Sequence, residues 1–266
     1  MTRRPGSFLV ALAVALVVTA GAALAVPSTA APSPSAAVAS APTYVQRTIL
    51  VGTSVRGRAI KAYFRGDPKA TRVLVVLGQM HGDEGAGRAT VGWIWTHVRP
   101  PAGTGIWVLP TMNPDGAARH RRVNARGVDL NRNWPTSGWT RTSPGSRYYG
   151  GPKPASEPET RAMMRFLADV RPDFIASIHQ PLRGVGRSGP NVPWETRLSR
   201  NLGLPLKYFG VGNPTGTVSP TMTGWYNQKY DGTATTIEYA ARTTSWFRTI
   251  GAGRGIARAA AVYGAA

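Results

Sequence analysis

The sequence contains no cysteine and few acidic residues. Without cysteine, the chain cannot form disulfides, thiolate metal sites, iron–sulfur centres or a cysteine nucleophile. Only 12 of the 266 residues are Asp or Glu against 32 Lys or Arg, which gives a formal net charge of +20. We find no internal repeat and no low-complexity tract after residue 42. Because 42% of the residues are apolar, we expect one globular domain with a sizeable core and Gly/Pro-rich connections.

The N-terminal stretch is typical of a secretory signal. Arg3 and Arg4 precede an uncharged apolar run over 8–26, and small residues follow it. We therefore expect a signal peptide over 1–31, an Ala/Pro/Ser-rich linker over 32–42 and the folded domain over 43–266. The apolar run approaches the length of a membrane span. No basic stop-transfer flank follows it, so we expect cleavage, no stable membrane span afterwards and a secreted, extracellular protein.

The excess of positive charge is carried mainly by arginine. In an exported protein it suits an anionic surrounding, such as a cell-wall polymer or a membrane surface, with which the protein would associate. A bias in composition is the alternative explanation. Nucleic acid is not an expected partner, because the arginines are scattered, no basic helix or aromatic RNA-binding signature is present, and the protein is expected to be exported.

Short apolar runs end at polar, reactive residues in four places. The runs cover 72–77, 106–109, 174–178 and 235–237. Continuous apolar runs of this length are typical of strands buried on both faces of a largely parallel sheet. The polar residues that follow them include His81 and Glu84, Asn113 to Gly116, His179, and Glu238. Ligands bind beyond the carboxyl ends of such strands, so these residues are candidates for one site.

Helical patterns lie between the expected strands, over 87–98, 156–170 and 254–263. Ser156-Glu-Pro-Glu159 has the spacing of a capping box and predicts the start of the second helix. Strands that alternate with helices predict an α/β fold. We expect a single domain with a mixed, largely parallel, twisted sheet and helices on both faces.

His81, Glu84 and His179 could together hold a metal ion. His81 and Glu84 form a His-x-x-Glu pair after one strand, and His179 follows another as a distant third ligand. Such a set leaves one position of a catalytic zinc ion for water. With only 4 histidines in the chain, two at strand ends are informative; we expect His97 and His120 to be ordinary surface or packing residues.

Glu238 and an arginine-rich loop supply further candidates. A carboxylate at the end of an apolar run is costly unless it meets a cation or takes part in catalysis, and Glu238 could serve as a general base beside a metal-bound water. Residues 119–135 contain several arginines, and such a loop is more often a solvated surface. The pair Asn131-Arg132, in a Gly/Pro-bounded loop, is better explained as a site that binds a carboxylate.

Six separated motifs together resemble the zinc metallocarboxypeptidase family of carboxypeptidase A type. In that family's order they are His81–Glu84, Asn113–Gly116, Gly127–Trp134, Ser156–Glu159, Ser177–His179 and Thr236–Glu238. The resemblance covers most of residues 72–240 and implies a zinc carboxypeptidase-like catalytic domain over 43–266.

The resemblance also assigns roles to the candidate residues. It implies that His81, Glu84 and His179 bind one zinc ion and that Glu238 activates a water molecule. Arg122 would polarise the scissile carbonyl, with Arg119 and Arg121 as rival candidates for this role. Asn131 and Arg132 would hold the terminal carboxylate of the substrate. Asp129 would orient the first histidine ligand, His81. Tyr226 and Tyr230 are the candidates for a tyrosine that covers the substrate.

The local sequences Asn124–Pro135 and His179–Leu182 are similar to those of the bacterial murein peptide amidase branch of this family. That resemblance implies hydrolysis of a terminal amide bond next to a free carboxylate, in a peptide or muropeptide that contains a γ-D-glutamyl–diaminopimelate bond. A general metallocarboxypeptidase is the first alternative. Small-molecule deacylases of the aspartoacylase kind lack two of the motifs, and a catalytically silent wall-binding module would be expected to lack Glu238.

Overall fold

The computed structural model describes residues 44–187, 189–209 and 219–264. The expected signal peptide over 1–31 and linker over 32–42 lie outside the described residues. Within the described part of the chain, no helix has the length and apolar character that crossing a bilayer requires.

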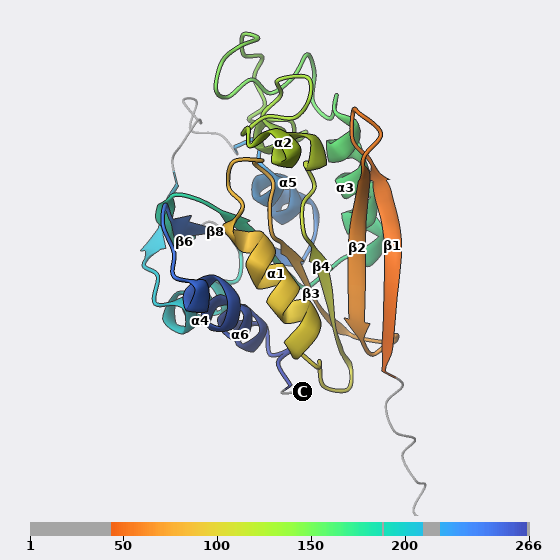
Figure 1. Ribbon diagram of the computed structural model, residues 1–266, viewed down its shortest axis with the longest axis vertical. Coiled ribbons are helices and arrows are strands. Elements are labelled where there is room, and N and C mark those ends of the chain that lie inside the picture. The colour runs from red at the N-terminus through yellow and green to blue at the C-terminus, as the bar shows by residue number, and fades with distance from the viewer. Residues whose placement is uncertain (1–43, 188, 210–218, 265–266) are drawn as a thin grey trace, which may run out of the picture. The chain divides into compact units, whose positions relative to one another are not determined.

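Eight strands form one mixed sheet (Figure 1). From one edge to the other they are β1 (Val45–Thr53), β2 (Ala59–Gly66), β4 (Thr104–Leu109), β3 (Arg72–Leu77), β5 (Phe174–His179), β8 (Thr233–Ala240), β6 (Leu182–Gly186) and β7 (Leu206–Lys207). The four central strands β4, β3, β5 and β8 are parallel. The pairs β1–β2, β2–β4 and β6–β8 are antiparallel, while β6 and β7 run parallel. The expected mixed, largely parallel sheet is therefore confirmed.

Helices cover both faces of the sheet. They are α1 (Ala86–His97), α2 (Pro114–Arg119), the 3₁₀ turn η1 (Leu130–Arg132), α3 (Pro158–Val170), α4 (Val192–Leu202), α5 (Met222–Lys229), the π turn η2 (Phe247–Gly251) and α6 (Ala252–Ala259). Successive residues of a strand point to opposite faces, so the buried strand β3 serves two cores. Leu74 and Val76 pack with residues of α1, α4 and α6, whereas Val75 and Leu77 pack with residues of α3 and α5.

The sequence pattern located three helices, but it misjudged one helix start and one helix end. The second helix begins at Pro158 with Glu157 as its N-cap, and no side chain caps it, so the expected capping box at Ser156 is wrong. The Ser156 hydroxyl instead donates to Glu157 Oε1 at 2.8 Å and accepts from Asn133 Nδ2 at 2.9 Å. The last helix, α6, ends at Ala259 rather than at residue 263.

The register of the central strands brings the candidate residues to one edge of the sheet. His179 lies opposite Glu238 in the β5–β8 pair. The segment with His81 and Glu84 follows β3, which pairs with β5. The chain continues from β3 to β4 on one side and from β5 to β8 on the other, and α/β sheets bind ligands at such a switch point.

Candidate active site

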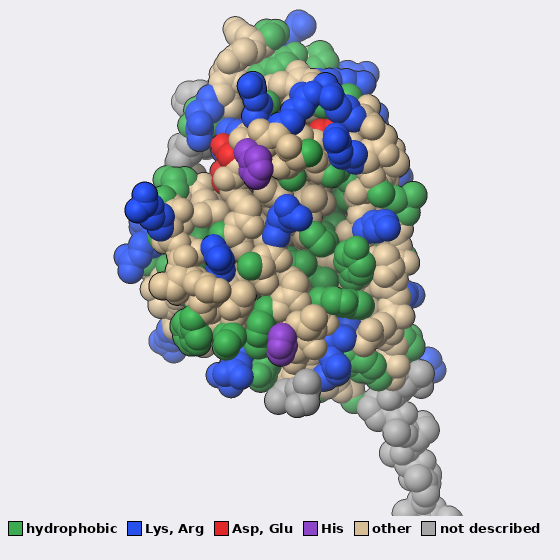
Figure 2. All heavy atoms as spheres, viewed as in Figure 1, with side chains coloured by type: hydrophobic (Ala, Val, Ile, Leu, Met, Phe, Trp, Pro, Cys, Tyr) green, Lys and Arg blue, Asp and Glu red, His purple; other side chains and the backbone are tan. Residues whose placement is uncertain are grey.

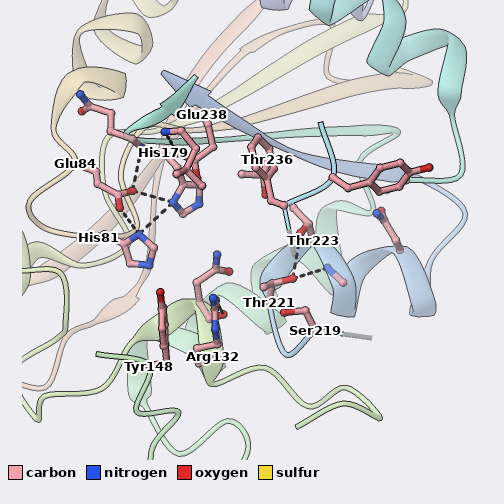
Figure 3. A pocket seen from close by; sticks show the side chains of 18 of the residues that line it. His81, Glu84, Arg132, Tyr148, His179, Ser219, Thr221, Thr223, Thr236 and Glu238 are labelled. Atoms are coloured by element: carbon pink, nitrogen blue, oxygen red, sulfur yellow. Dashed lines mark hydrogen bonds and ion pairs between the residues drawn. The ribbon is translucent and has the colours of Figure 1, made fainter. Parts of the chain in front are cut away.

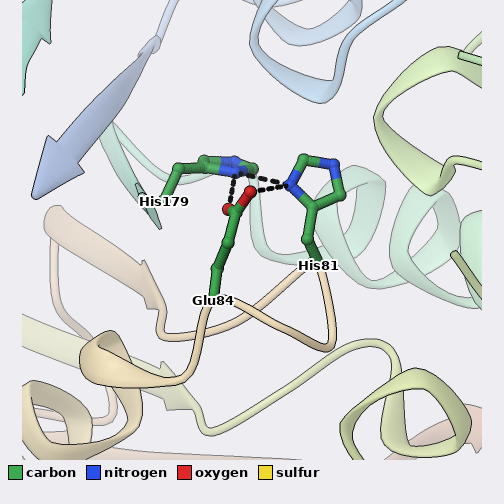
Figure 4. Close-up of side chains that lie close together, drawn as sticks. All are labelled: His81, Glu84 and His179. Atoms are coloured by element: carbon green, nitrogen blue, oxygen red, sulfur yellow. Dashed lines mark hydrogen bonds and ion pairs between the residues drawn. The ribbon is translucent and has the colours of Figure 1, made fainter. Parts of the chain in front are cut away.

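His81, Glu84 and His179 converge on one point, as Figure 4 shows. Their donor atoms all lie within 4.8 Å of one another. His81 Nδ1 is 2.9 Å from Glu84 Oε1, and His179 Nδ1 is 2.9 Å from Glu84 Oε2. The two Nδ1 atoms are 3.2 Å apart. All three side chains are buried. These short distances show that the structure brings the expected ligand set together.

The other nitrogen of each histidine has its own partner. His81 Nε2 is 3.0 Å from Asp129 Oδ1, and His179 Nε2 is 3.1 Å from Ser177 Oγ. These contacts fix the ring orientations and direct both Nδ1 atoms toward Glu84. Burial alone raises the pKa of Asp129, but the charge and hydrogen bond of His81, followed by the charge of Arg122, hold that pKa well below its usual range.

These donors fit a zinc ion. Two imidazole nitrogens and one carboxylate form a three-ligand set typical of catalytic zinc sites. Burial lowers the pKa of His81, but Asp129 and Glu84 together raise it to about 8. Because zinc binds the neutral ring, the ion takes the place of a proton on this histidine.

Arg122 lies next to the ligands and is bonded to Asp129. Its Nε and Nη2 atoms donate to Asp129 Oδ2 at 3.1 and 2.8 Å. Its Nη1 atom lies 3.2 Å from His81 Nδ1 and 3.3 Å from Glu84 Oε1. Arg119 and Arg121 are exposed and do not line the cleft that Arg122 lines. Among the three candidates, the geometry therefore favours Arg122 as the carbonyl-polarising residue.

Glu238 faces the same cleft from β8 (Figure 3). The residue is only 8% exposed, and its Oε2 atom accepts a hydrogen bond from Leu182 N at 3.2 Å. Burial raises the pKa of Glu238, while the charge of His179 opposes the rise. A carboxylate with a raised pKa beside the metal ligands is suited to accept a proton from water.

Asn131 and Arg132 both line the cleft, and Figure 3 shows Arg132 below the metal ligands. Met222 N donates to Asn131 Oδ1 at 3.1 Å, and Arg132 Nη1 donates to Asn131 O at 2.8 Å. Both side chains are buried. The cleft has a volume of about 680 Å³ and also contains His81, Glu84, His179 and Glu238.

Sequence reasoning missed Tyr148. Its ring lies 5.1 Å from the guanidinium carbon of Arg132 and 5.8 Å from that of Arg122, so it packs beside both cleft arginines. The surrounding loop has no periodic pattern, and no signal in the sequence identifies this residue. Tyr226 and Tyr230, which we considered as covering residues, do not line the cleft. Tyr226 is fully buried and donates to Pro172 O at 2.6 Å.

Other expectations for single residues agree with the structure. His97 is exposed at the end of α1 and stacks on Trp93, and exposed His120 caps α2. Neither histidine lines the cleft. Sequence reasoning did not single out a group of neutral polar residues at the far side of the cleft, because such residues are common on any surface. They are Thr221, Thr223, Asn227, Gln228 and Thr236.

A fold of this kind with a buried His-Glu-His site defines a metal-dependent hydrolase, and comparison with protein families identifies it further. A zinc carboxypeptidase model matches residues 36–183, which is more than half of the chain. The chain therefore belongs to the zinc carboxypeptidase family. Members of this family are zinc-dependent hydrolases, so the expected enzyme class and the expected cofactor, one zinc ion, are confirmed.

Characterised relatives include both amidases and carboxypeptidases. Murein peptide amidase A of Escherichia coli K12 is 34% identical over 119 residues, which are 41% of this chain and 49% of that protein. The rat carboxypeptidase N catalytic chain is 27% identical over 233 residues, which are 70% of this chain and 50% of that protein. The chain thus spans about half the length of these relatives.

Solved structures show the same fold. The murein-tripeptide amidase of Escherichia coli O157 superposes with a TM-score of 0.63 at 23% identity, covering 82% of this chain and 92% of that one. Carboxypeptidase A of Helicoverpa armigera gives a TM-score of 0.65 at 19% identity, covering 82% and 69%. At these identities the similarity establishes the fold alone.

Proposed function

We propose that the protein hydrolyses a terminal amide bond next to a free carboxylate in cell-wall peptides, at a γ-D-glutamyl–diaminopimelate linkage. One observation carries the proposal: three ligands for zinc, a buried carboxylate and an Asn-Arg pair share one cleft. A zinc ion on the three ligands would activate an amide carbonyl, the buried carboxylate can transfer protons, and the Asn-Arg pair can bind a carboxylate of the substrate.

The side chains divide the chemistry among them. A zinc ion held by His81, Glu84 and His179 supplies a Lewis acid at the scissile carbonyl. Glu238 takes the proton from the attacking water and returns it to the leaving amine. Arg122, held by Asp129, directs its guanidinium toward the ligands and stabilises the negative charge that develops on the carbonyl oxygen.

Asn131 and Arg132 make the cleavage terminal. Both are buried in the cleft wall, where the Arg132 guanidinium can grip a carboxylate of the leaving residue. An internal peptide bond offers no carboxylate at this point. Substrates that lack the terminal carboxylate do not form this charge-assisted contact, so they bind more weakly.

The pocket beyond Arg132 disfavours a side chain with a net positive charge. Thr221, Thr223 and Thr236 line it, and Figure 3 shows them opposite the metal ligands. The buried Ser219 Oγ has no hydrogen-bond partner among the described residues. The acidic residues that line the cleft are Glu84 and Glu238, so the described part of this pocket offers no carboxylate to a lysine or arginine side chain. The paired ammonium and carboxylate of diaminopimelate suit such a lining.

We also propose that the protein is secreted and acts at the cell wall. The expected signal over 1–31, the net charge of +20 and the relationship to murein peptide amidases support this location. Expression in a bacterial host, followed by N-terminal sequencing of the extracellular protein, tests it. A chain that stays inside the cell with residue 1 intact would contradict it.

Three peptides test the substrate class. The zinc-loaded protein is incubated with L-Ala-γ-D-Glu-meso-diaminopimelate, with the same tripeptide ending in L-Lys, and with an ordinary peptide ending in Phe. Mass spectrometry of the products should show fast release of diaminopimelate and slow release of Lys and Phe. Faster cleavage of the ordinary peptide would instead identify a general metallocarboxypeptidase.

A single substitution tests the role of the pocket. Thr223→Asp places a carboxylate in the neutral lining, so release of Lys should rise relative to release of diaminopimelate. Thr223→Ser serves as the matched control and should keep the original preference. If Thr223→Asp leaves the ratio of the two rates unchanged, the pocket does not select the leaving side chain.

A further inference from the structure

The acidic residues of this protein are mostly inside it. Seven of the 12 are buried: Glu84, Asp115, Asp129, Glu157, Glu159, Glu195 and Glu238. Among the described basic residues only Arg65 and Arg132 are buried. The surface is therefore more strongly positive than the composition suggests. Four acidic residues are exposed, Asp83, Asp169, Asp173 and Asp231, and Asp67 is half-buried.

One face of the molecule has no acidic residue in the segments that build it. We call it the α1–α6 face; it consists of α1, η2 and α6, which pack against one another, and of the segment 241–246 between β8 and η2. Residues 85–114 and 239–264 contain six arginines and no Asp or Glu. Figure 2 shows Lys and Arg side chains spread over the side on which α1 lies, with acidic side chains only toward its upper end.

The arginines of this face are available to a ligand. Arg88, Arg242, Arg248 and Arg254 are exposed, and among the described residues none of them forms an ion pair. The neighbouring helix α4 adds exposed arginines, while its single acidic residue, Glu195, is buried. Like charges on one face repel one another, so an anion that bridges them is favoured.

The α1–α6 face reaches the edge of the active-site cleft. Arg242 and Arg248 line a hollow of about 550 Å³ together with Ala86, Ala89 and Gln180. Gln180 also lines the cleft, and its Oε1 atom accepts a hydrogen bond from Ala86 N at 3.0 Å. A ligand bound along this face would therefore lie beside the cleft without entering it.

The chemistry of the face favours a polymer over a lipid surface. Membrane-surface helices combine basic residues with a broad apolar face. Among the described residues of 85–114 and 239–264, the exposed large apolar side chain is Trp246, 63% exposed. Guanidinium groups bind phosphate oxygens bidentately, and a row of them suits a chain with a repeated anionic group.

We propose that the α1–α6 face binds a linear, phosphate-containing polyanion and so holds the cleft close to an anionic matrix. Binding here is separate from hydrolysis, because Arg88, Arg242, Arg248 and Arg254 do not line the cleft. Affinity depends on counterion release, and each lost phosphate contact reduces the slope of log K against log[salt] by about 0.7 to 0.9.

The test uses the full chain and long-chain inorganic polyphosphate. Binding is measured by fluorescence anisotropy between about 50 and 200 mM NaCl, the range over which such contacts weaken strongly. The variant R88Q/R242Q/R248Q/R254Q should bind at least about tenfold more weakly at low salt and lose about 3 from the salt slope. Hydrolysis of a small peptide should stay at the wild-type rate, which also shows that the variant folds. If the quadruple variant fails to fold, R242Q/R248Q replaces it, with about half the loss of slope.

A control variant that loses the same number of positive charges elsewhere distinguishes the effect of this face from the effect of net charge. Arg47 lies in β1, Arg165 in α3 and Lys229 in α5, while Arg171 directly follows α3. The core on this side of the sheet is the one that contains Phe166 and Trp225. R47Q/R165Q/R171Q/K229Q should keep wild-type binding. Equal loss in both variants, or no loss in the first, would overturn the proposal. Preferential binding to anionic phosphatidylglycerol vesicles that Trp246→Ser abolishes would overturn it in favour of a membrane surface.

Discussion

Glu238 stands apart from the three metal ligands, and its substitution separates catalysis from metal binding. Glu238→Gln keeps the size of the side chain but removes the base, so turnover should fall by at least about 10² to 10⁴. Zinc content, measured by atomic absorption, should stay near one ion per chain, because the ligand cluster does not include Glu238. Glu84→Ala, the control, should lose both activity and zinc. A Glu238→Gln protein with the wild-type rate would contradict the assigned role.

The pH dependence of the zinc-loaded enzyme should report the environment of Glu238. Burial raises the pKa of this carboxyl above its ordinary value of 4.5. The base acts in its charged form, which exists above that raised pKa, so kcat/KM should fall on the acidic side with a midpoint above 4.5. Initial rates between pH 4 and 8 measure the profile. A midpoint at or below 4.5 would show that another group controls the reaction.

Some residues of the site could be predicted from the sequence, and others could not. His81, Glu84, His179 and Glu238 could be predicted because buried parallel strands deliver their following residues to one edge of a sheet. Tyr148 could not, because it occupies a loop whose course depends on long-range contacts. The choice of Arg122 over its neighbours also needs the structure, since only the fold shows which arginine turns toward Asp129.

At the scale of elements, the segment between α2 and α3 has little regular structure, yet it positions most of the groups that we propose to bind substrate. Asn133 anchors it. Its Nδ2 atom donates to Gly150 O at 2.7 Å and Ser156 Oγ at 2.9 Å, and its Oδ1 accepts from Glu157 N at 3.2 Å. Asn133 directly follows η1, which contains Asn131 and Arg132. The buried amide of Asn133 therefore supports the proposed carboxylate-binding pair, Asn131 and Arg132, from behind.

Asn133→Ala should weaken both the fold and substrate binding. The substitution leaves several buried groups without partners and should lower the free energy of unfolding by about 3 kcal/mol in a urea titration. KM should rise more than kcat falls if the displaced pair, Asn131 and Arg132, binds substrate as proposed. Asn201→Ala removes one bond, to Gly255 O, at an exposed position and should cost less than about 1 kcal/mol. Equal losses in the two variants would contradict the anchoring role.

Regular elements were predictable where hydrophobic periodicity was strong. Strand β3 was expected over its full length, and α1 was displaced by one residue. Strand β1 and helix α5 were not identified, because their buried or half-buried residues follow no regular spacing. Strand β2 and helix α4 were also missed, although Trp194, Leu198 and Leu202 of α4 are buried at helical spacing. The Ser156 hydroxyl serves Asn133 and Glu157 instead of the helix, which shows tertiary contacts overriding a local capping signal.

At the scale of the whole molecule, zinc should contribute directly to stability. The chain has no cysteine, so no disulfide restrains its unfolded state. The ion binds side chains from β5 and from the segment after β3, and the unfolded chain does not hold these together. At a free zinc concentration about 100 times Kd, binding stabilises the fold by about 2.7 kcal/mol. For a domain of this size, that corresponds to a Tm shift of roughly 5 to 10 °C.

Chelation should therefore lower Tm by that amount, as measured by differential scanning calorimetry at pH 8 with and without excess EDTA. His179→Ala provides the control: it cannot complete the ligand set, so its Tm should already be low and should not respond to the chelator. The Tm difference between the zinc-loaded and the chelated protein should also shrink on acidification below about pH 8. Asp129 and Glu84 raise the pKa of His81 to about 8, so below this pH protons compete with zinc for the ring. A wild-type Tm that is the same with and without EDTA would contradict the role of the ion in holding these segments together.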